Sequence, residues 1–219
     1  MVQAKLTLML KRIRNERVQF ITRLELIKYC KFFDIDYDYA VRYYLRKGYF
    51  VRIFKGIFYV KSTDEVMLGV ERYNHMELVA KGLSLKSVSQ WYFGLHTALK
   101  LNNMTHEYFS VEDIVSDKLL RITPMLISGH KIKFTRISSS LFGFGTVKRK
   151  SRIPGTSIIY SDPERTILDF VYLWRYNGVS AERIISDIRE WTENVDRNKM
   201  RRYGRKYPMS IQNILEIVK

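Results

Sequence analysis

The arginines and tyrosines between residues 39 and 46 have the residue types and spacing best suited to chemistry. They recur three and four residues apart, so a helix would carry them along one side. The members of this stripe are Tyr39, Arg42, Tyr43 and Arg46. A helix fits the major groove of DNA, which is about 12 Å wide, and Arg42 and Arg46 would then reach bases or phosphates. The pattern predicts a surface for duplex nucleic acid.

A pair of strands follows this helix at once. Residues 49–54 and 57–60 are rich in aromatic and β-branched residues, and Lys55-Gly56 between them can turn. The resulting hairpin would hold Arg52 and Lys55 near the adjacent backbone or minor groove. With Lys47 at the end of the helix, the full set of candidate DNA-binding residues is Tyr39, Arg42, Tyr43, Arg46, Lys47, Arg52 and Lys55.

Local signals place three helices before this hairpin. An amphipathic stretch around residues 6–13 is typical of a first helix. Thr22 and Glu25 form a capping box for a second helix over 23–33, and Asp36 can cap a third over 37–47. Gly48 suits a left-handed helix end. The apolar positions that would face inward on the third helix are Ala40, Val41, Tyr44 and Leu45. The order of these elements predicts an N-terminal winged helix-turn-helix.

The charge of the chain agrees with a polyanionic partner. The 219 residues include 38 Lys and Arg against 22 Asp and Glu, which gives a formal net charge of +16. Residues 1–61 hold fourteen of these bases and five acids, a net charge of +9 in under a third of the chain. Charge alone leaves nucleic acid, an anionic membrane and an acidic protein as partners. The 46% apolar content indicates a folded globular protein.

Beyond the hairpin the sequence predicts a connecting segment over 62–82 and a C-terminal α+β domain over 83–219. A helix is expected over 62–80, followed by a helix in the small-residue and aromatic run 83–101. Four short strands are then expected at 108–111, 119–123, 131–136 and 156–160. Ser161 or Asp162, with Pro163, begins a further helix, and the last helices cover 181–191 and 208–218. The overall prediction is an α+β fold with a helical C-terminus.

Three segments in this order resemble the AbiEi-type antitoxins and transcriptional regulators. They are the helix end and hairpin over 45–60, the serine-rich run over 83–91 with Gly94-Leu95-His96, and the segment Ser161-Asp162-Pro163-Glu164-Arg165-Thr166-Ile167-Leu168-Asp169. The resemblance spans about residues 15–190. It implies the antitoxin of a type IV toxin–antitoxin pair linked to abortive infection. In that family the N-terminal domain binds repeats in its own promoter and represses it, and the C-terminal domain counteracts a nucleotidyltransferase-like toxin, often without a stable complex.

Sites for catalysis, metals and cofactors are not expected. Cys30 is the single cysteine, and the histidines at 75, 96, 106 and 130 lack zinc-ligand spacing. The acidic cluster most similar to a nuclease pattern consists of Glu112, Asp113 and Asp117 with Lys118. Its sequence is more typical of a polar loop or an exposed helix face. Asp162, Glu164 and Asp169 are better explained by helix capping and by ion pairing with Arg165. No nucleophile elbow or phosphate-binding glycine loop is present. The sequence therefore predicts a binding protein and no enzyme.

The location and the remaining alternatives follow from the same residues. Residues 6–10 are too short an apolar run for an export signal, and 87–99 is too short to span a bilayer. We therefore expect a cytoplasmic protein with no membrane contact. Two alternatives to DNA binding stay open: a module that binds an acidic protein directly, and an RNA-binding protein. The sequence leaves open the oligomeric state, with a monomer among the options, and the role of the basic segment 197–206.

Overall fold

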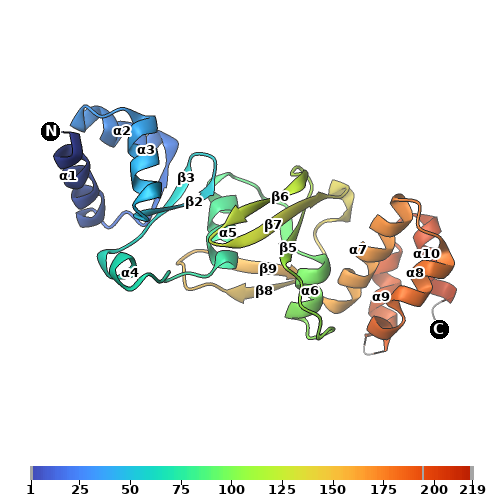
Figure 1. The fold of residues 1–219 in the computed structure, drawn as a ribbon. Coiled ribbons are helices and arrows are strands. Elements are labelled where there is room, and N and C mark those ends of the chain that lie inside the picture. Colours follow the sequence, from blue (N-terminus) through green and yellow to red (C-terminus); the bar gives the residue numbers. More distant parts are fainter. Residues whose placement is uncertain (1, 194, 218–219) are drawn as a thin grey trace. The chain divides into compact units, whose positions relative to one another are not determined.

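The computed structural model describes residues 2–193 and 195–217 (Figure 1). Ten α-helices and two β-sheets lie within these residues, so the predicted α+β class is confirmed. Internal contacts divide the chain into two compact units. The first unit comprises residues up to 87 with 127–129 and 152–156, and the second comprises 88–126, 130–151 and 157 onward.

The first unit begins with three helices and a small sheet. Its elements are α1 (Val2–Asn15), β1 (Phe20–Thr22), α2 (Arg23–Phe33), α3 (Tyr37–Arg46), β2 (Phe50–Phe54) and β3 (Ile57–Val60). The sheet order is β1-β3-β2, and both pairings are antiparallel. The second and third helices and the hairpin lie where the sequence predicts them, within about one residue at their ends, and α1 extends beyond the predicted 6–13 to Val2 and Asn15. The strand β1 was not predicted, because three residues carry no alternating pattern.

Local capping explains where these helices begin and end. Thr22 accepts a hydrogen bond from the Glu25 backbone N–H at 3.4 Å, and the Glu25 carboxylate accepts one from the Thr22 N–H at 2.7 Å. Asp34 ends α2 in the left-handed region with φ +51°. Asp36 then accepts a hydrogen bond from the Tyr39 N–H at 2.7 Å and begins α3. The predicted capping box is therefore confirmed.

The expected single helix over 62–80 is wrong. The structure has two helices there, α4 (Thr63–Leu68) and α5 (His75–Leu85). Gly69 adopts φ +67° and ends α4, and Asn74 caps α5 in a second capping box with Glu77. Gly82 lies within α5 and allows close packing on β2, because an added Cβ would lie 2.6 Å from Ile53 Cγ2.

The second unit holds a mixed six-stranded sheet with helices around it. Its strands are β4 (Trp91–Phe93), β5 (Val111–Ser116), β6 (Arg121–Ile127), β7 (His130–Arg136), β8 (Thr146–Lys150) and β9 (Ser157–Ser161), in the order β6-β7-β5-β4-β9-β8. Its helices are α6 (Leu95–Leu101), α7 (Pro163–Tyr176), α8 (Ala181–Ile188), α9 (Arg197–Gly204) and α10 (Met209–Ile217). The helix α7 packs with α8, α9 and α10 at the C-terminal end of the chain (Figure 1).

The expected helix over 83–101 is also wrong. Residues 91–93 form the strand β4, which pairs with β5 in antiparallel and with β9 in parallel orientation. Gly94 separates β4 from α6 and allows close packing, because an added Cβ would lie 2.6 Å from Val115 Cγ2. A fully buried strand shows no alternation of apolar and polar residues, so its aromatic run has the same pattern as a buried helix.

Other differences concern strand positions and the basic C-terminal region. The strand expected at 108–111 begins only at Val111, and the one at 119–123 is shifted to 121–127, whereas 131–136 and 156–160 lie within about one residue of β7 and β9. The exposed strand β8 was not predicted, since its Lys- and Arg-rich sequence has no apolar face. The basic segment 197–206 is mostly the helix α9. The last helix ends at Ile217, and Val218 of the predicted range lies outside the described residues.

Over residues 2–193 and 195–217, no helix is both long and apolar enough to cross a bilayer.

Candidate nucleic-acid interface

The helix α3 has one buried face that holds it in the first unit. Ala40, Val41 and Tyr44 are buried against the other helices and the sheet. The Tyr44 hydroxyl donates a hydrogen bond of 2.8 Å to the Leu6 carbonyl of α1, and its ring lies 4.7 Å from that of Phe50. Burial raises the pKa of Tyr44, so this hydroxyl stays a donor at neutral pH. The orientation of α3 is therefore fixed by its own sequence pattern and one buried hydrogen bond.

The opposite side of α3 carries the predicted stripe. Arg42, Arg46 and Lys47 are exposed, and Tyr39 is 44% exposed. The Arg42 Nε donates to the Asp38 carbonyl at 3.3 Å, which holds the guanidinium along the helix. Tyr43 is half-buried, with its ring packed edge-on against Tyr44 at 5.7 Å. The arginines of the stripe are therefore accessible to a partner, and Tyr43 packs against the buried Tyr44.

The hairpin of β2 and β3 adds two further exposed cations. Arg52 pairs in register with Phe58, and its guanidinium carbon lies 5.7 Å from the centre of that ring. Lys55 lies in the turn and is exposed. Gly56 beside it adopts φ +74°, which an L side chain rarely does, so the turn requires glycine at this position. We call the seven predicted residues on α3 and the hairpin the cationic surface.

The cations of the cationic surface have no acidic side chain within ion-pair distance among the described residues. None of the ion pairs found in 2–193 and 195–217 involves Arg42, Arg46, Lys47, Arg52 or Lys55. Other bases of the first unit do have acidic partners, such as Lys5 with Asp34 at 3.0 Å. An exposed cation without a protein partner is free to neutralise a phosphate.

The structure adds Arg23 to this region, a residue that the sequence reasoning missed. Its backbone N–H donates to the Gly56 carbonyl at 2.6 Å, and its guanidinium lies 5.3 Å from the ring centre of Tyr37. Burial raises the pKa of Tyr37, and the nearby charges of Arg23 and Arg52 oppose that shift. Arg23, Arg52 and the first residue of α3 are therefore close together. Only the hairpin's contact with α2 brings them together, so no local sequence signal could have found Arg23.

A different charged cluster lies buried in the second unit around Arg165. Its guanidinium carbon is 4.3 Å from the ring centre of Tyr92 and 4.5 Å from that of Phe144. Its Nη2 donates to the Tyr92 hydroxyl at 3.0 Å, and its Nε lies 3.7 Å from Asp169 Oδ2. Tyr92 and Tyr207 each donate a hydrogen bond of 2.7 Å to the Asp169 carboxylate. Burial raises the pKa of Asp169, and the Arg165 charge opposes that shift.

The acidic residues before and within α7 have the structural partners expected of caps and ion pairs, with one difference. Asp162 accepts a hydrogen bond from the Arg165 N–H at 2.9 Å and caps the helix. Asp169 pairs with Arg165 as expected. Glu164 instead pairs with Lys199 of α9 at 2.7 Å, because α9 packs against α7.

The acidic cluster at 112–117 was expected in a loop or helix face, and this is wrong for its first two residues. Glu112 and Asp113 are buried on the strand β5. Glu112 accepts hydrogen bonds from Thr97 at 2.8 Å and from Lys100 at 3.0 Å. Asp113 lies 2.9 Å from His96 Nδ1. The partners Thr97, Lys100 and His96 all lie on α6, so the sequence around residues 112–117 could not indicate them.

Cys30 is buried in α2. Burial, together with the nearby Asp36 carboxylate, raises the pKa of its thiol to about 11. The thiol therefore stays protonated at neutral pH and is a poor nucleophile there.

Comparisons with known proteins show similarity to a solved structure at the level of the fold. No protein-family profile matches the sequence, and no curated protein is significantly similar to it. Among solved structures, the crystal structure of the RV2827C protein from Mycobacterium tuberculosis has a TM-score of 0.53 to this chain. The match covers 95% of this chain and 74% of that chain at 12% sequence identity. At this identity the likeness concerns the fold alone.

Proposed function

We propose that the first unit is a winged helix that binds duplex DNA. In this proposal α3 enters the major groove with Arg42 and Arg46, and the hairpin of β2 and β3 is the wing. The observation that carries it is the cationic surface, whose bases are exposed and lack acidic partners among the described residues. The net charge of +9 over residues 1–61 favours the same conclusion.

The biological role in this proposal is that of a transcriptional repressor and antitoxin. It rests on the resemblance of three sequence segments to AbiEi-type regulators. The chain would bind repeats in its own promoter in the cytoplasm and counteract a nucleotidyltransferase-like toxin, with no enzymatic activity of its own. The third of these segments, residues 161–169, supplies the cap and the buried Arg165–Asp169 pair of α7. It therefore maintains the core of the second unit.

Titration of labelled duplex DNA tests the DNA-binding part of the proposal. The duplex carries the intergenic region upstream of the gene, and fluorescence anisotropy follows binding at several salt concentrations. We expect affinity to fall steeply with salt, and the Arg42→Ala/Arg46→Ala variant to lose specific binding. The matched variant Lys11→Ala removes an exposed cation of α1 and should bind nearly as wild type. Equal affinity of wild type and the double variant would refute the proposal, as would stronger competition by structured RNA than by duplex DNA.

Co-expression tests the antitoxin part independently. The neighbouring gene product is induced in cells with or without this chain, and growth is measured. Rescue of growth by the full chain supports the role of antitoxin. Co-purification of the two proteins would identify direct contact with the toxin, and rescue without co-purification would identify an indirect mechanism. A neighbouring product that is harmless, or toxicity that the chain does not relieve, would contradict the assignment.

A further inference from the structure

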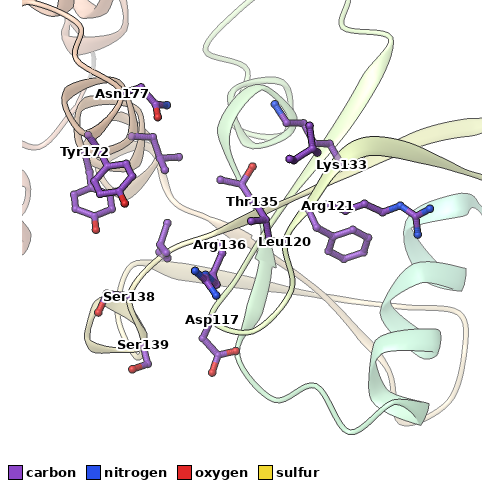
Figure 2. Close-up of a pocket in the computed structure, with 15 residues that line it drawn as sticks. Asp117, Leu120, Arg121, Lys133, Thr135, Arg136, Ser138, Ser139, Tyr172 and Asn177 are labelled. Atoms are coloured by element: carbon purple, nitrogen blue, oxygen red, sulfur yellow. The ribbon is translucent and has the colours of Figure 1, made fainter.

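The second unit contains a cleft that the DNA-binding proposal does not use. It has a volume of about 980 Å³ and is lined by residues around β6 and β7 and by the C-terminal end of α7 (Figure 2). Pockets that bind small ligands typically have volumes of about 300–1,000 Å³. The cleft is therefore large enough for an extended or composite ligand.

Three cations line the strand side of this cleft. Arg121 begins β6, and Lys133 and Arg136 lie on β7. All three are exposed, and no ion pair in the described part of the chain involves any of them. Among the lining residues that the structure describes, Asp117 is the one acid. The cleft therefore has an excess of positive charge and suits an anionic ligand.

Two tyrosines of α7 form the other side. The rings of Tyr172 and Tyr176 are stacked, with centroids 6.4 Å apart and an interplanar angle of 28°. Tyr176 is 80% exposed, and Asn177 follows it with its side-chain amide at the end of the helix. An exposed aromatic ring that shares a cleft with cations free of ion pairs is a combination that proteins use to bind unpaired bases and their phosphates.

We propose that this cleft binds a nucleotide unit of single-stranded nucleic acid. The phosphate lies against Lys133 and Arg136 of β7, and the base stacks on Tyr176. An acidic peptide would use the cations but would gain little from the exposed ring. A duplex would keep its bases paired and out of reach of the tyrosine. A free nucleotide offers the same phosphate and base chemistry, so the experiment separates the two sources.

The site is independent of the proposed winged helix. Its residues belong to the second unit, and the cationic surface belongs to the first. Binding can therefore be measured in the full-length Arg42→Ala/Arg46→Ala chain, in which binding of nucleic acid to α3 is weakened. Failure of one proposal then leaves the other testable.

Fluorescence anisotropy with a labelled short oligouridylate tests this proposal. In the Arg42→Ala/Arg46→Ala background, Tyr176→Ala should weaken binding by about tenfold, because the stacked base loses its aromatic partner. Lys133→Ala/Arg136→Ala should weaken binding by about tenfold at low salt and less at high salt, because two phosphate contacts are lost. The matched controls are Lys148→Ala/Arg149→Ala on the exposed strand β8 and Tyr108→Ala, which is 89% exposed outside the cleft. Both controls should bind nearly as the background chain. Far-UV circular dichroism checks that every variant is folded.

Competitors then identify the ligand. Displacement of the oligouridylate by millimolar ATP, with the same dependence on Tyr176, assigns the cleft to a free nucleotide. Failure of ATP to displace it assigns the cleft to the strand. Three results would overturn the proposal. The first is an equal loss of affinity in the Lys148→Ala/Arg149→Ala control, which would mean diffuse charge attraction. The second is unchanged binding of the oligouridylate to Tyr176→Ala. The third is an equal effect of Tyr176→Ala on inorganic polyphosphate, which has no base to stack.

Discussion

Arg42 and Arg46 lie on the exposed side of α3, whereas Arg165 of α7 is fully buried in the second unit. The first two have no acidic partner among the described residues. Arg165 contacts the rings of Tyr92 and Phe144 and pairs with Asp169. Arginine side chains are thus available to a partner in the first unit, whereas Arg165 contributes to the core of the second.

The difference shows that the net charge of the chain does not tell how many of its basic residues can bind a partner. A buried guanidinium loses its hydration, so it is retained only where rings, carbonyls and a carboxylate replace the water. An exposed guanidinium keeps its hydration and can exchange it for phosphate at low cost. Substitutions in the two sets should therefore separate stability from binding.

The largest effect is expected from Arg165→Ala. The substitution leaves the buried Asp169 carboxylate without its cation and should lower the free energy of unfolding by about 3–5 kcal/mol. Tryptophan fluorescence during urea unfolding measures it, since Trp91, Trp174 and Trp191 all lie in the second unit. A loss below about 1 kcal/mol would show that the pair contributes little.

A double variant sharpens this result. Arg165→Met with Asp169→Leu removes both charges and keeps apolar volume in the core. Because no unpaired charge remains buried, the double variant should be more stable than Arg165→Ala. A double variant as unstable as the single one would point to packing of Arg165 on its aromatic neighbours as its main contribution.

The next effect is on DNA affinity and comes from Arg46→Ala. If Arg46 reads a base, the substitution should weaken binding by about 1–3 kcal/mol, with less discrimination at one position of the site. Thermal stability should stay nearly unchanged, since the side chain is exposed. Anisotropy titrations on wild-type and point-mutated duplexes measure both terms. An unchanged footprint and affinity would remove Arg46 from the contact residues.

An intermediate case is Glu77 of α5, a buried carboxylate whose partner Arg152 is 62% exposed. Burial disfavours its charge, but hydrogen bonds from Arg152 and Asn74 outweigh burial and lower the pKa of Glu77 from 4.5 to about 2. A lowered folded-state pKa stabilises the fold above about pH 4.5, and this contribution is lost as the pH falls toward about 2.

Glu77→Gln should therefore lower the free energy of unfolding of the first unit by about 1–2 kcal/mol at pH 7, a value discounted because water around the exposed Arg152 screens the pair. At pH 3, between the folded and unfolded pKa values, the loss should be less than half as large. Urea unfolding followed by far-UV circular dichroism at the two pH values measures the difference. An equal loss at both pH values would mean that the charge of Glu77 contributes nothing.

The smallest effect is expected from Lys55→Ala in the hairpin turn. Loss of a single phosphate contact should weaken binding similarly on all sequences and reduce the slope of log affinity against log salt by about one. Binding isotherms at four or more salt concentrations measure the slope. An unchanged slope would mean that the turn does not contact the DNA backbone.

Local rules predicted the elements whose ends are set by a few neighbouring residues. The capping residues Thr22, Asp36 and Asp162 and the turn at Gly56 all act within three or four positions. The prediction over 62–80 failed although its signals are local, since Gly69 ends α4 and Asn74 caps α5. The prediction over 83–101 failed because pairing with distant segments decides the structure there. β4 is a strand because β5 and β9 flank it, and a run of three aromatic residues carries no such information.

The candidate site shows the same division. The stripe on α3 follows from helical spacing, so its exposed side could be predicted from the order of residues. Arg23 joins this region only through the contact between α2 and the hairpin. The cleft of the second unit requires β6, β7 and α7 to come together, and no single segment carries its pattern.

The sequence by itself determined the charge of the chain, the first three helices and the outward side of α3, because these depend on composition and on contacts within a few residues. Only the tertiary structure decided which charges stay in water and which are buried. That outcome depends on partners far along the chain, as Tyr92 and Tyr207 are from Asp169. The physical reason is the cost of desolvation. A charged side chain can be buried only where the fold supplies hydrogen bonds and an opposite charge in place of water.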